Sequence, residues 1–179
     1  MSTTTAIQWK IDAAHSEIQF KVRHMMVSTV TGFFREFDAT VESTTDNFQG
    51  ARISFAAQTA SLDTNNAQRD GHLRSPDFFD AETYPEISFK SSSLEHIAGD
   101  NYKLVGDLTL HGVTKPVALD VAYFGAMTDP YGNQKAGFEL NGEVNRTDFG
   151  LKWNTVLETG GVMVSEKVRL HANVQLQKG

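Results

Sequence analysis

Apolar and polar residues alternate along most of this 179-residue chain, and this pattern constrains the fold more than any other feature. Side chains point to alternate faces of a β-strand, so each run predicts a strand with one dry and one wet face. In the first clear run, residues 17–24, Ile18, Phe20 and Val22 alternate with polar residues. Further runs begin near residues 53, 87, 104, 117, 138 and 168. The sequence therefore predicts an all-β protein built from antiparallel strands.

Residues 61–79 interrupt the alternation. Asp63 or Thr64 is a candidate cap for a short helix running to about Leu73, and Pro76 is suited to start a second turn. We therefore expect a short helical segment around residues 64–79. Eight or so strands with this single interruption predict a sandwich or an up-and-down barrel. An eight-stranded antiparallel β-barrel has no exposed edges and is just wide enough for one small ligand.

Composition narrows the class of protein. The net charge of −6 favours neither nucleic acid nor an anionic membrane surface as a partner. The chain has no cysteine, which excludes disulfides and thiolate metal sites, and its histidines lack metal-ligand spacing. No serine-hydrolase, zinc-protease or phosphate-loop motif occurs, so we expect neither an enzyme nor a bound cofactor or metal.

The chain shows no internal repeat and no linker, so we expect one domain over residues 1–179. No apolar run is long enough for a transmembrane segment. The first residues lack the basic and apolar regions of a secretion signal. We therefore expect a cytoplasmic protein as the sequence stands, or a periplasmic one if a leader has been removed.

Two polar residues fall where the alternation places apolar ones. His24 shares a face with Ile18, Phe20 and Val22, and Arg146 ends the series of residues 138–144. By the same count His171 falls on a wet face. One interpretation is structural: a hydrogen-bonded histidine at the core margin, and an arginine in an ion pair with Asp70 or Asp148. The other is functional: polar anchors at the mouth of an apolar cavity.

The apolar residues of the dry faces are candidates for the wall of such a cavity. Twelve phenylalanines dominate the aromatic residues, and the pair Phe78-Phe79 in the irregular segment would suit a lid over an apolar opening. The alternative is a solid, phenylalanine-rich core. Mid-strand Gly106 and Gly142 are expected to border the same space. The candidate ligand-binding residues are Phe20, Val22, His24, Phe33, Phe37, Phe55, Phe78, Phe89, Leu108, Leu140 and Arg146.

Five short motifs in order resemble the YceI-like, or polyisoprenoid-binding, proteins, and the resemblance covers almost the whole chain. The motifs are Asp12 with His15-Ser16, Phe20 and His24, followed by Gly32-Phe33; Arg69-Asp70 with His72-Leu73, Ser75 and Asp77-Phe78-Phe79; Tyr84-Pro85 with Ile87 and Phe89; residues 106–117, GDLTLHGVTKPV; and Asn145-Arg146 with Asp148-Phe149-Gly150. The block at 106–117 is the most specific of them.

The resemblance implies a lipocalin-like, extended barrel that binds, stores or transports a long apolar lipid. The lipid would be a polyisoprenoid or an isoprenoid quinone, and family members are often periplasmic. Two alternatives stay open: a stress-related or scaffold protein with a filled core, and an enzyme that uses His24, Arg146 and Asp70 on a bound lipid. A homodimer is also left open.

Overall fold

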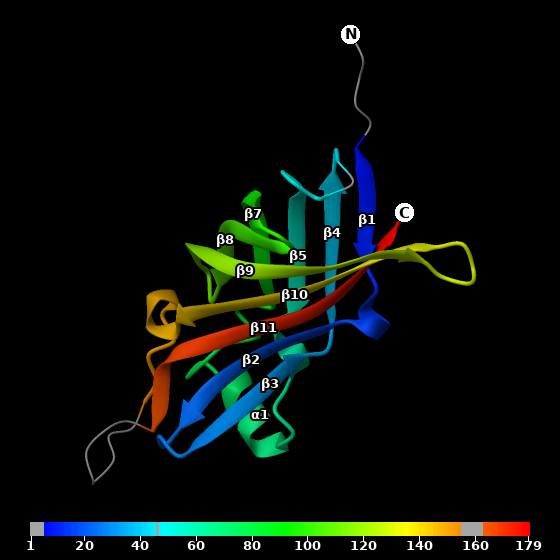
Figure 1. Ribbon diagram of the computed structural model, residues 1–179. Helices are drawn as coiled ribbons and strands as arrows, with labels where there is room; N and C mark the ends of the chain where they lie inside the picture. Colours follow the sequence, from blue (N-terminus) through cyan, green and yellow to red (C-terminus); the bar gives the residue numbers. More distant parts are fainter. Residues whose placement is uncertain (1–5, 46, 155–162) are drawn as a thin grey trace.

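The computed structural model describes residues 6–45, 47–154 and 163–179 (Figure 1). The strands are β1 (Ile7–Ile11), β2 (Glu17–His24), β3 (Ser28–Phe34), β4 (Phe37–Ser43), β5 (Arg52–Gln58), β6 (Leu62–Asp63), β7 (Glu86–Ala98), β8 (Asn101–Leu110), β9 (Val113–Thr128), β10 (Gln134–Asn145) and β11 (Val164–Lys178). The helices are α1 (Ala67–Arg74) and the short 3-10 turns η1 (Ala13–His15), η2 (Thr59–Ser61) and η3 (Arg146–Phe149). The prediction of an all-β protein with one short helical segment is confirmed.

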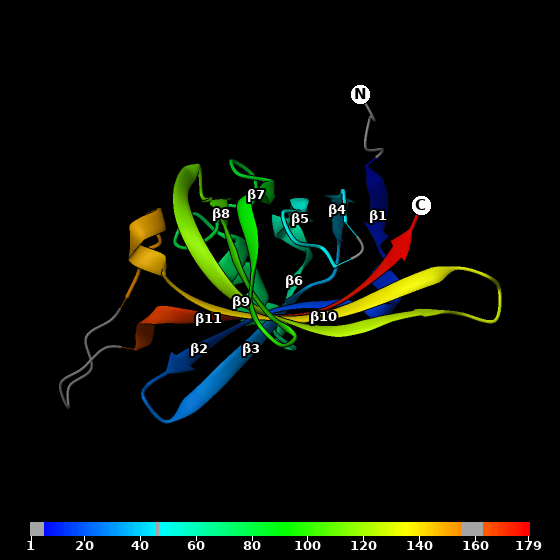
Figure 2. The same ribbon diagram turned by 45° about the horizontal axis from the view of Figure 1, so that its top comes forward.

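Eight of these strands close into an antiparallel barrel, as predicted. Their order is β1-β4-β5-β7-β8-β9-β10-β11, and pairing between β11 and β1 completes the ring. Closure leaves no free edge in this ring, which satisfies the backbone groups that an open sheet would expose. The remaining strands extend the sheet at one end, where β2 pairs with β11, β3 with β2, and β6 with β3 (Figure 2).

The last strand, β11, connects the eight-stranded ring to the extension formed by β2, β3 and β6, because it changes partner along its length. Residues 164–173 pair with β2, and residues 176–178 pair with β1. The chain bends at η1 between these two partners. Asp12 holds the bend: its backbone N–H donates to Gln175 O at 2.8 Å, and its carboxylate accepts from Lys135 Nζ at 3.3 Å. Because of this bend, the consecutive strands β1 and β2 pair with different parts of β11.

Helix α1 lies at the end of the barrel where β6 pairs with β3 (Figure 1). It precedes β7 in the chain, and Leu73, Phe78 and Phe79 of this segment pack against the core. The helix begins later than predicted. Asn66 is its cap and accepts from Arg69 N at 2.9 Å. The predicted cap, Thr64, instead donates its N–H and hydroxyl to the Asp70 carboxylate, which is buried.

Aromatic rings fill the opposite end of the barrel. Phe48, only 2% exposed, lies in the connection after β4. Its ring centroid is 5.2 Å from Trp9, 5.5 Å from Tyr123 and 5.0 Å from Phe138. Tyr102 Oη donates to Asn47 O at 2.5 Å and fixes the connection that carries Phe48. We call this group of rings, Phe48, Trp9, Tyr123 and Phe138, the aromatic plug.

Candidate functional site

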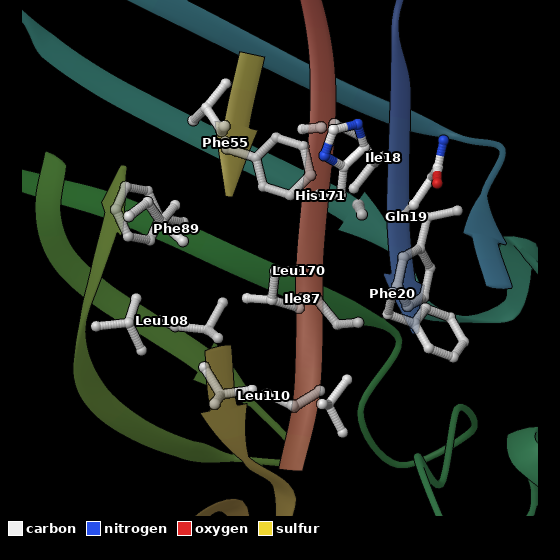
Figure 3. A pocket seen from close by; sticks show the side chains of 18 of the residues that line it. Ile18, Gln19, Phe20, Phe55, Ile87, Phe89, Leu108, Leu110, Leu170 and His171 are labelled. Carbon is white, nitrogen blue, oxygen red and sulfur yellow. The ribbon is translucent and has the colours of Figure 1, made fainter. Parts of the chain in front are cut away.

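The barrel encloses a cavity of about 380 Å³. Its volume lies within the range of about 300–1,000 Å³ that is typical of small-molecule sites. Side chains from β2, β5, β7, β8 and β11 converge on it, and nearly all of them are apolar (Figure 3). The dry faces of the strands therefore line a space and do not fill the barrel completely. Examples of its wall are Ile18, Phe55, Ile87, Leu110 and Leu170.

The cavity extends from the aromatic plug to the opposite end of the barrel. Phe48 and Phe138 of the plug belong to its wall. At the other end its wall includes His24, Arg146 and the half-exposed Val164. We call this the His24 end. The two ends differ in chemistry, because one is aromatic and sealed and the other carries polar side chains near solvent.

The structure brings nine of the eleven candidate ligand-binding residues to this wall. They come from strands, from the segment after α1 and from the start of η3. These residues are Phe20, Val22, His24, Phe55, Phe78, Phe89, Leu108, Leu140 and Arg146.

Phe33 and Phe37 lie elsewhere, and the expectation for these two needs correction. They border a separate, polar hollow beside the η1 bend. On β3 the inward positions belong to Gly32 and Phe34, so Phe33 points outward, where Arg35 lies 4.4 Å above its ring. Phe37 is the first residue of β4 and stacks on Phe55, with ring centroids 6.4 Å apart.

His24 occupies the position that its parity predicts. It is the last residue of β2, half-buried, and it borders the cavity. Among the described residues its imidazole has no hydrogen-bond partner, whereas its backbone carbonyl accepts from Ser28 Oγ. In the described part of the chain, the His24 imidazole therefore does not make the hydrogen bond to a backbone group or a carboxylate that the structural interpretation requires.

Arg146 is 5% exposed, and its partners differ from the expected ones. The guanidinium donates to four backbone carbonyls, those of Leu151 at 2.7 Å, Ser165 at 2.8 Å, Trp153 at 2.9 Å and Val164 at 3.2 Å. Neither predicted aspartate bonds to it: Asp70 accepts from Thr64, and Asp148 is exposed.

The carbonyls satisfy the hydrogen bonds of Arg146 but leave its charge without a carboxylate among the described residues. Burial lowers the pKa of Arg146 from its ordinary value, and the more distant Glu166 opposes this shift. An arginine nonetheless stays charged in a protein. The His24 end of the cavity therefore carries a buried positive charge, which favours an electron-rich or anionic group nearby.

The segment with α1 adds two polar side chains that belong to the second motif but were not among the candidate ligand-binding residues. Arg69 and His72 border the cavity. The His72 ring contacts Phe78 and Trp153, with centroids 5.1 Å and 4.9 Å away, and its Nε2 lies 2.9 Å from Asp77 Oδ2. Trp153 lies outside any alternating run, so periodicity gave no signal for it. Phe34 did have a signal, since it shares the parity of Gly32 on β3.

Gln19 and His171 sit next to each other at the edge of the cavity, on β2 and β11 (Figure 3). His171 Nδ1 lies 2.7 Å from Asn141 Oδ1, and Asn141 is an exposed residue of β10. This polar contact agrees with the outward parity of His171.

The two glycines expected beside the cavity serve packing. A Cβ at Gly106 would lie 2.4 Å from Lys90 O and 2.5 Å from the Phe89 ring. A Cβ at Gly142 would lie 2.2 Å from Leu119 Cδ2. Neighbouring atoms therefore already occupy the space beside both glycines, and neither residue borders the cavity itself.

Over residues 6–45, 47–154 and 163–179, no group of three or more acidic or histidine side chains is arranged to hold a metal ion. Within the same part of the chain, no helix has the length and apolarity needed to cross a bilayer.

Comparisons with known proteins agree with this architecture. The family described as YceI-like domain matches residues 9–176. The UPF0312 protein SA2479 of Staphylococcus aureus N315 is 36% identical over 165 residues, which are 92% of this chain and 94% of that protein. The crystal structure of a Campylobacter jejuni YCEI protein is 30% identical, covers 100% of this chain and 99% of its own, and has a TM-score of 0.76.

A third likeness concerns the fold alone. A polyisoprenoid binding domain from Saccharophagus degradans is 15% identical, with a TM-score of 0.67 over 96% of this chain and 98% of that one. The resemblance drawn from the five motifs is thus confirmed by independent comparisons, and this chain belongs to the YceI-like family.

Proposed function

We propose that this protein binds a long apolar lipid of the isoprenoid class, with the tail inside the barrel. The observation that carries the proposal is the cavity of about 380 Å³ whose wall is nearly all apolar. A filled core, the alternative for a scaffold protein, would leave no such space. The description of the Saccharophagus degradans domain as polyisoprenoid binding supports the same ligand class.

Burial of the tail supplies enough free energy for this role. Removing about 500 Å² of apolar ligand surface from water contributes about 12 kcal/mol at ~25 cal/mol per Å². Ordering a flexible chain and joining two molecules offset a large part of this gain. Micromolar or tighter binding remains within reach without any bond being made or broken.

The polar head of the lipid would lie at the His24 end. The His24 imidazole has no described partner, so it is available to donate to or accept from a head group. Arg146 contributes mainly through its charge, because four carbonyls already take up most of its N–H groups. A quinone carbonyl or a phosphate would suit both residues. The aromatic plug at the other end offers no comparable charge.

Storage or transport fits these features better than catalysis. Asp70, the acid that an enzyme would need, is buried, and its carboxylate already accepts hydrogen bonds from the N–H and the hydroxyl of Thr64. The pocket selects a ligand by apolar shape and by one polar end.

Equilibrium partitioning from detergent micelles tests the proposal. An isoprenoid quinone and a hydrocarbon of the same tail length are offered separately, and mass spectrometry quantifies the lipid in the protein fraction. Both should bind. His24→Ala should weaken binding of the quinone about threefold to tenfold, because one hydrogen bond is lost, and leave the hydrocarbon unchanged.

His96→Ala is the matched control, since His96 is exposed and bonds to Gly99 O. This substitution should change the binding of neither ligand. Equal effects of His24→Ala on quinone and hydrocarbon would refute the anchoring role of His24. Failure of both lipids to bind the unaltered protein would refute lipid binding itself.

A further inference from the structure

The turn between β2 and β3 exposes three apolar side chains at the His24 end of the cavity. Met25, Met26 and Val27 are 42%, 64% and 82% exposed. They follow His24 directly, and Met25 N donates to the carbonyl of Met163, a residue of the cavity wall, at 2.7 Å. This end of the hairpin lies beside the start of β11 (Figure 1). We call Met25, Met26 and Val27 the apolar tip.

Local folding does not account for the apolar tip. Met25 and Met26 have φ values of 53° and 61°, and Val27 N donates to His24 O at 3.3 Å. Two successive left-handed residues under such a bond define the tight hairpin turn that favours Asn and Gly. Asn-Gly would form the same turn with less strain and less exposed apolar surface. Strained, exposed methionines therefore indicate a role outside the fold.

Four cations lie beside the apolar tip on the outer face of the sheet. Lys21 and Arg23 are on β2, and Lys167 and Arg169 are on β11. Lys21 and Arg169 are directly opposite each other in the strand register. Like charges in such a cross-strand pair destabilise a sheet. The arrangement is unfavourable for the isolated protein and becomes favourable against an anionic surface.

Nearby acids only partly compensate these cations. Glu143 is opposite Arg169 on β10, and Glu166 lies in the bulge of β11. Two more carboxylates of this face, Glu17 on β2 and Glu139 on β10, lie at the far end of the strand pairing, where both are opposite Asn173. Beside the apolar tip, four cations against two carboxylates leave a local positive charge, although the whole chain has a net charge of −6. The net charge of the sequence, which favoured no anionic membrane surface, is an average that hides this local surplus.

We propose that the apolar tip and its four flanking cations dock this protein onto the surface of an anionic phospholipid membrane. The side chains of Met25, Met26 and Val27 enter the boundary between headgroups and acyl chains, and the cations contact lipid phosphates. Docking in this orientation turns the His24 end of the cavity toward the bilayer. The inference rests on the proposed lipid binding, and it assigns the route by which the lipid enters and leaves.

Flotation with lipid vesicles tests the docking. The protein should float with vesicles of phosphatidylcholine containing one third phosphatidylglycerol, much less with phosphatidylcholine alone, and less as salt is added. Met26→Ser with Val27→Ser should weaken binding about tenfold. Lys21→Glu should weaken it about tenfold or more, because each cation contributes about fivefold at an anionic surface.

Matched controls distinguish docking through the apolar tip from non-specific adsorption to vesicles. Phe124→Ser with Met127→Ser removes two other exposed apolar side chains, from β9, and should leave flotation unchanged. Lys115→Glu changes an exposed charge on β9 and should have a smaller effect than Lys21→Glu. Lys21→Glu also places a carboxylate opposite Arg169, so thermal unfolding should occur at the same or a higher temperature. Loss of flotation would then not reflect unfolding.

Partitioning of an isoprenoid quinone from micelles distinguishes this proposal from the proposed function. The tip and Lys21 variants should bind the quinone as the unaltered protein does, because these residues lie outside the cavity wall. Quinone binding without flotation on anionic vesicles, or flotation that the variants do not weaken, would overturn membrane docking. Flotation of an unaltered protein that takes up neither the quinone nor the matched hydrocarbon would support docking and refute the lipid-binding function.

Discussion

Arg146 carries a positive charge into the barrel wall and is held by backbone carbonyls. Replacement by methionine keeps much of its apolar volume and removes every donor. The carbonyls of Leu151, Trp153, Val164 and Ser165 would then lose their side-chain partner. We expect Arg146→Met to lower the free energy of unfolding by about 3 kcal/mol or more, since buried unsatisfied acceptors are costly. Urea denaturation followed by circular dichroism measures this loss.

Arg35→Met is the matched control for this substitution. The Arg35 side chain is 55% exposed, with its guanidinium over the Phe33 ring and its Nε 3.2 Å from Asp63 Oδ2. Exposed pairs contribute little, so we expect a much smaller change. Equal losses for the two variants would contradict the bracing role of Arg146.

Gly106 is needed for close packing of β8 on β7. In Gly106→Ala the new Cβ would lie 2.4 Å from Lys90 O and 2.8 Å from Ser91 Cα, and this backbone cannot move without breaking the sheet. We expect a loss of about 1–3 kcal/mol in the free energy of unfolding.

Gly137→Ala provides the comparison within the same barrel. Its nearest neighbour would be Phe124 Cβ at 3.8 Å, an ordinary contact. We expect it to leave stability unchanged or to raise it by up to about 1 kcal/mol, because alanine restricts the unfolded chain. Thermal unfolding of both variants checks the pair, and a larger loss for Gly137→Ala would contradict the packing described.

Alternation correctly placed residues of the long strands on the inner face of the barrel. It failed for Phe33 and Phe37, which lie where the chain passes from β3 to β4. It placed His24, Leu108 and Leu140 on the wall of the cavity. It could not choose between Phe33 and Phe34, two adjacent apolar residues, without the added signal of Gly32. The hydrogen-bond partners of Arg146 could not be predicted from the sequence, because they are backbone carbonyls whose directions depend on η3 and on a bulge in β11.

Among the elements, the η1 bend depends on a charge. The Asp12 carboxylate accepts from Lys135 Nζ at 3.3 Å and Gln175 Nε2 at 3.2 Å, and lies 2.9 Å from His15 Nδ1. Burial alone would raise the pKa of Asp12, but the hydrogen bonds and charges of His15 and Lys135 outweigh it and lower the pKa below its ordinary value.

The lowered pKa fixes the direction of a pH effect. A carboxyl group with a depressed folded-state pKa stabilises the fold above its unfolded pKa, about 4, and loses this contribution as pH falls further. Asp12→Asn should therefore lower the free energy of unfolding by about 1 kcal/mol at pH near 7. The difference from the unaltered protein should shrink below pH of about 4. Urea denaturation at both pH values measures it.

Asp107→Asn controls for the loss of a carboxylate, because Asp107 is exposed on β8. It should show no comparable pH-dependent difference. A deficit of Asp12→Asn that persists unchanged in acid would contradict the role of the charge.

Helix α1 shows why element boundaries are harder to predict than element types. The break in alternation indicated the segment correctly, but Asp63, Thr64 and Asn66 are all residues that can cap a helix. Tertiary contacts decide between them. Thr64 bonds to the buried Asp70, which leaves Asn66 as the cap.

At the scale of the whole molecule, the period-2 pattern predicted an antiparallel sandwich or barrel, because each strand has one dry face, and the resemblance to the YceI-like proteins implied the closed barrel that is found. The pattern did not predict that β11 would pair with both β1 and β2, since it carries no information on partners. Nor does alternation distinguish a filled core from a cavity. The volume left between inward side chains depends on barrel radius and on which rings fold back over glycines, as Phe20 does over Gly32.

Filling this cavity should remove lipid binding while keeping the barrel. Leu140 borders the cavity from β10, and Leu140→Trp places a larger ring in the empty space. We expect the lipid retained after micelle partitioning to fall about tenfold, with an unchanged far-ultraviolet spectrum. Ile97→Trp, at a position 63% exposed, is the control and should retain lipid. Full retention by a folded Leu140→Trp protein would contradict the position of the tail.

Mass spectrometry of the purified, unaltered protein is the most direct test of the central claim that the barrel holds a long apolar lipid. Native spectra, denatured spectra and an organic extract would be compared on the same preparation. We predict a native mass above that of the chain, a denatured mass equal to it, and one isoprenoid or similar lipid in the extract at close to one molecule per protein. A native mass equal to that of the bare chain, together with no uptake of added quinone or polyprenyl lipid, would contradict the account.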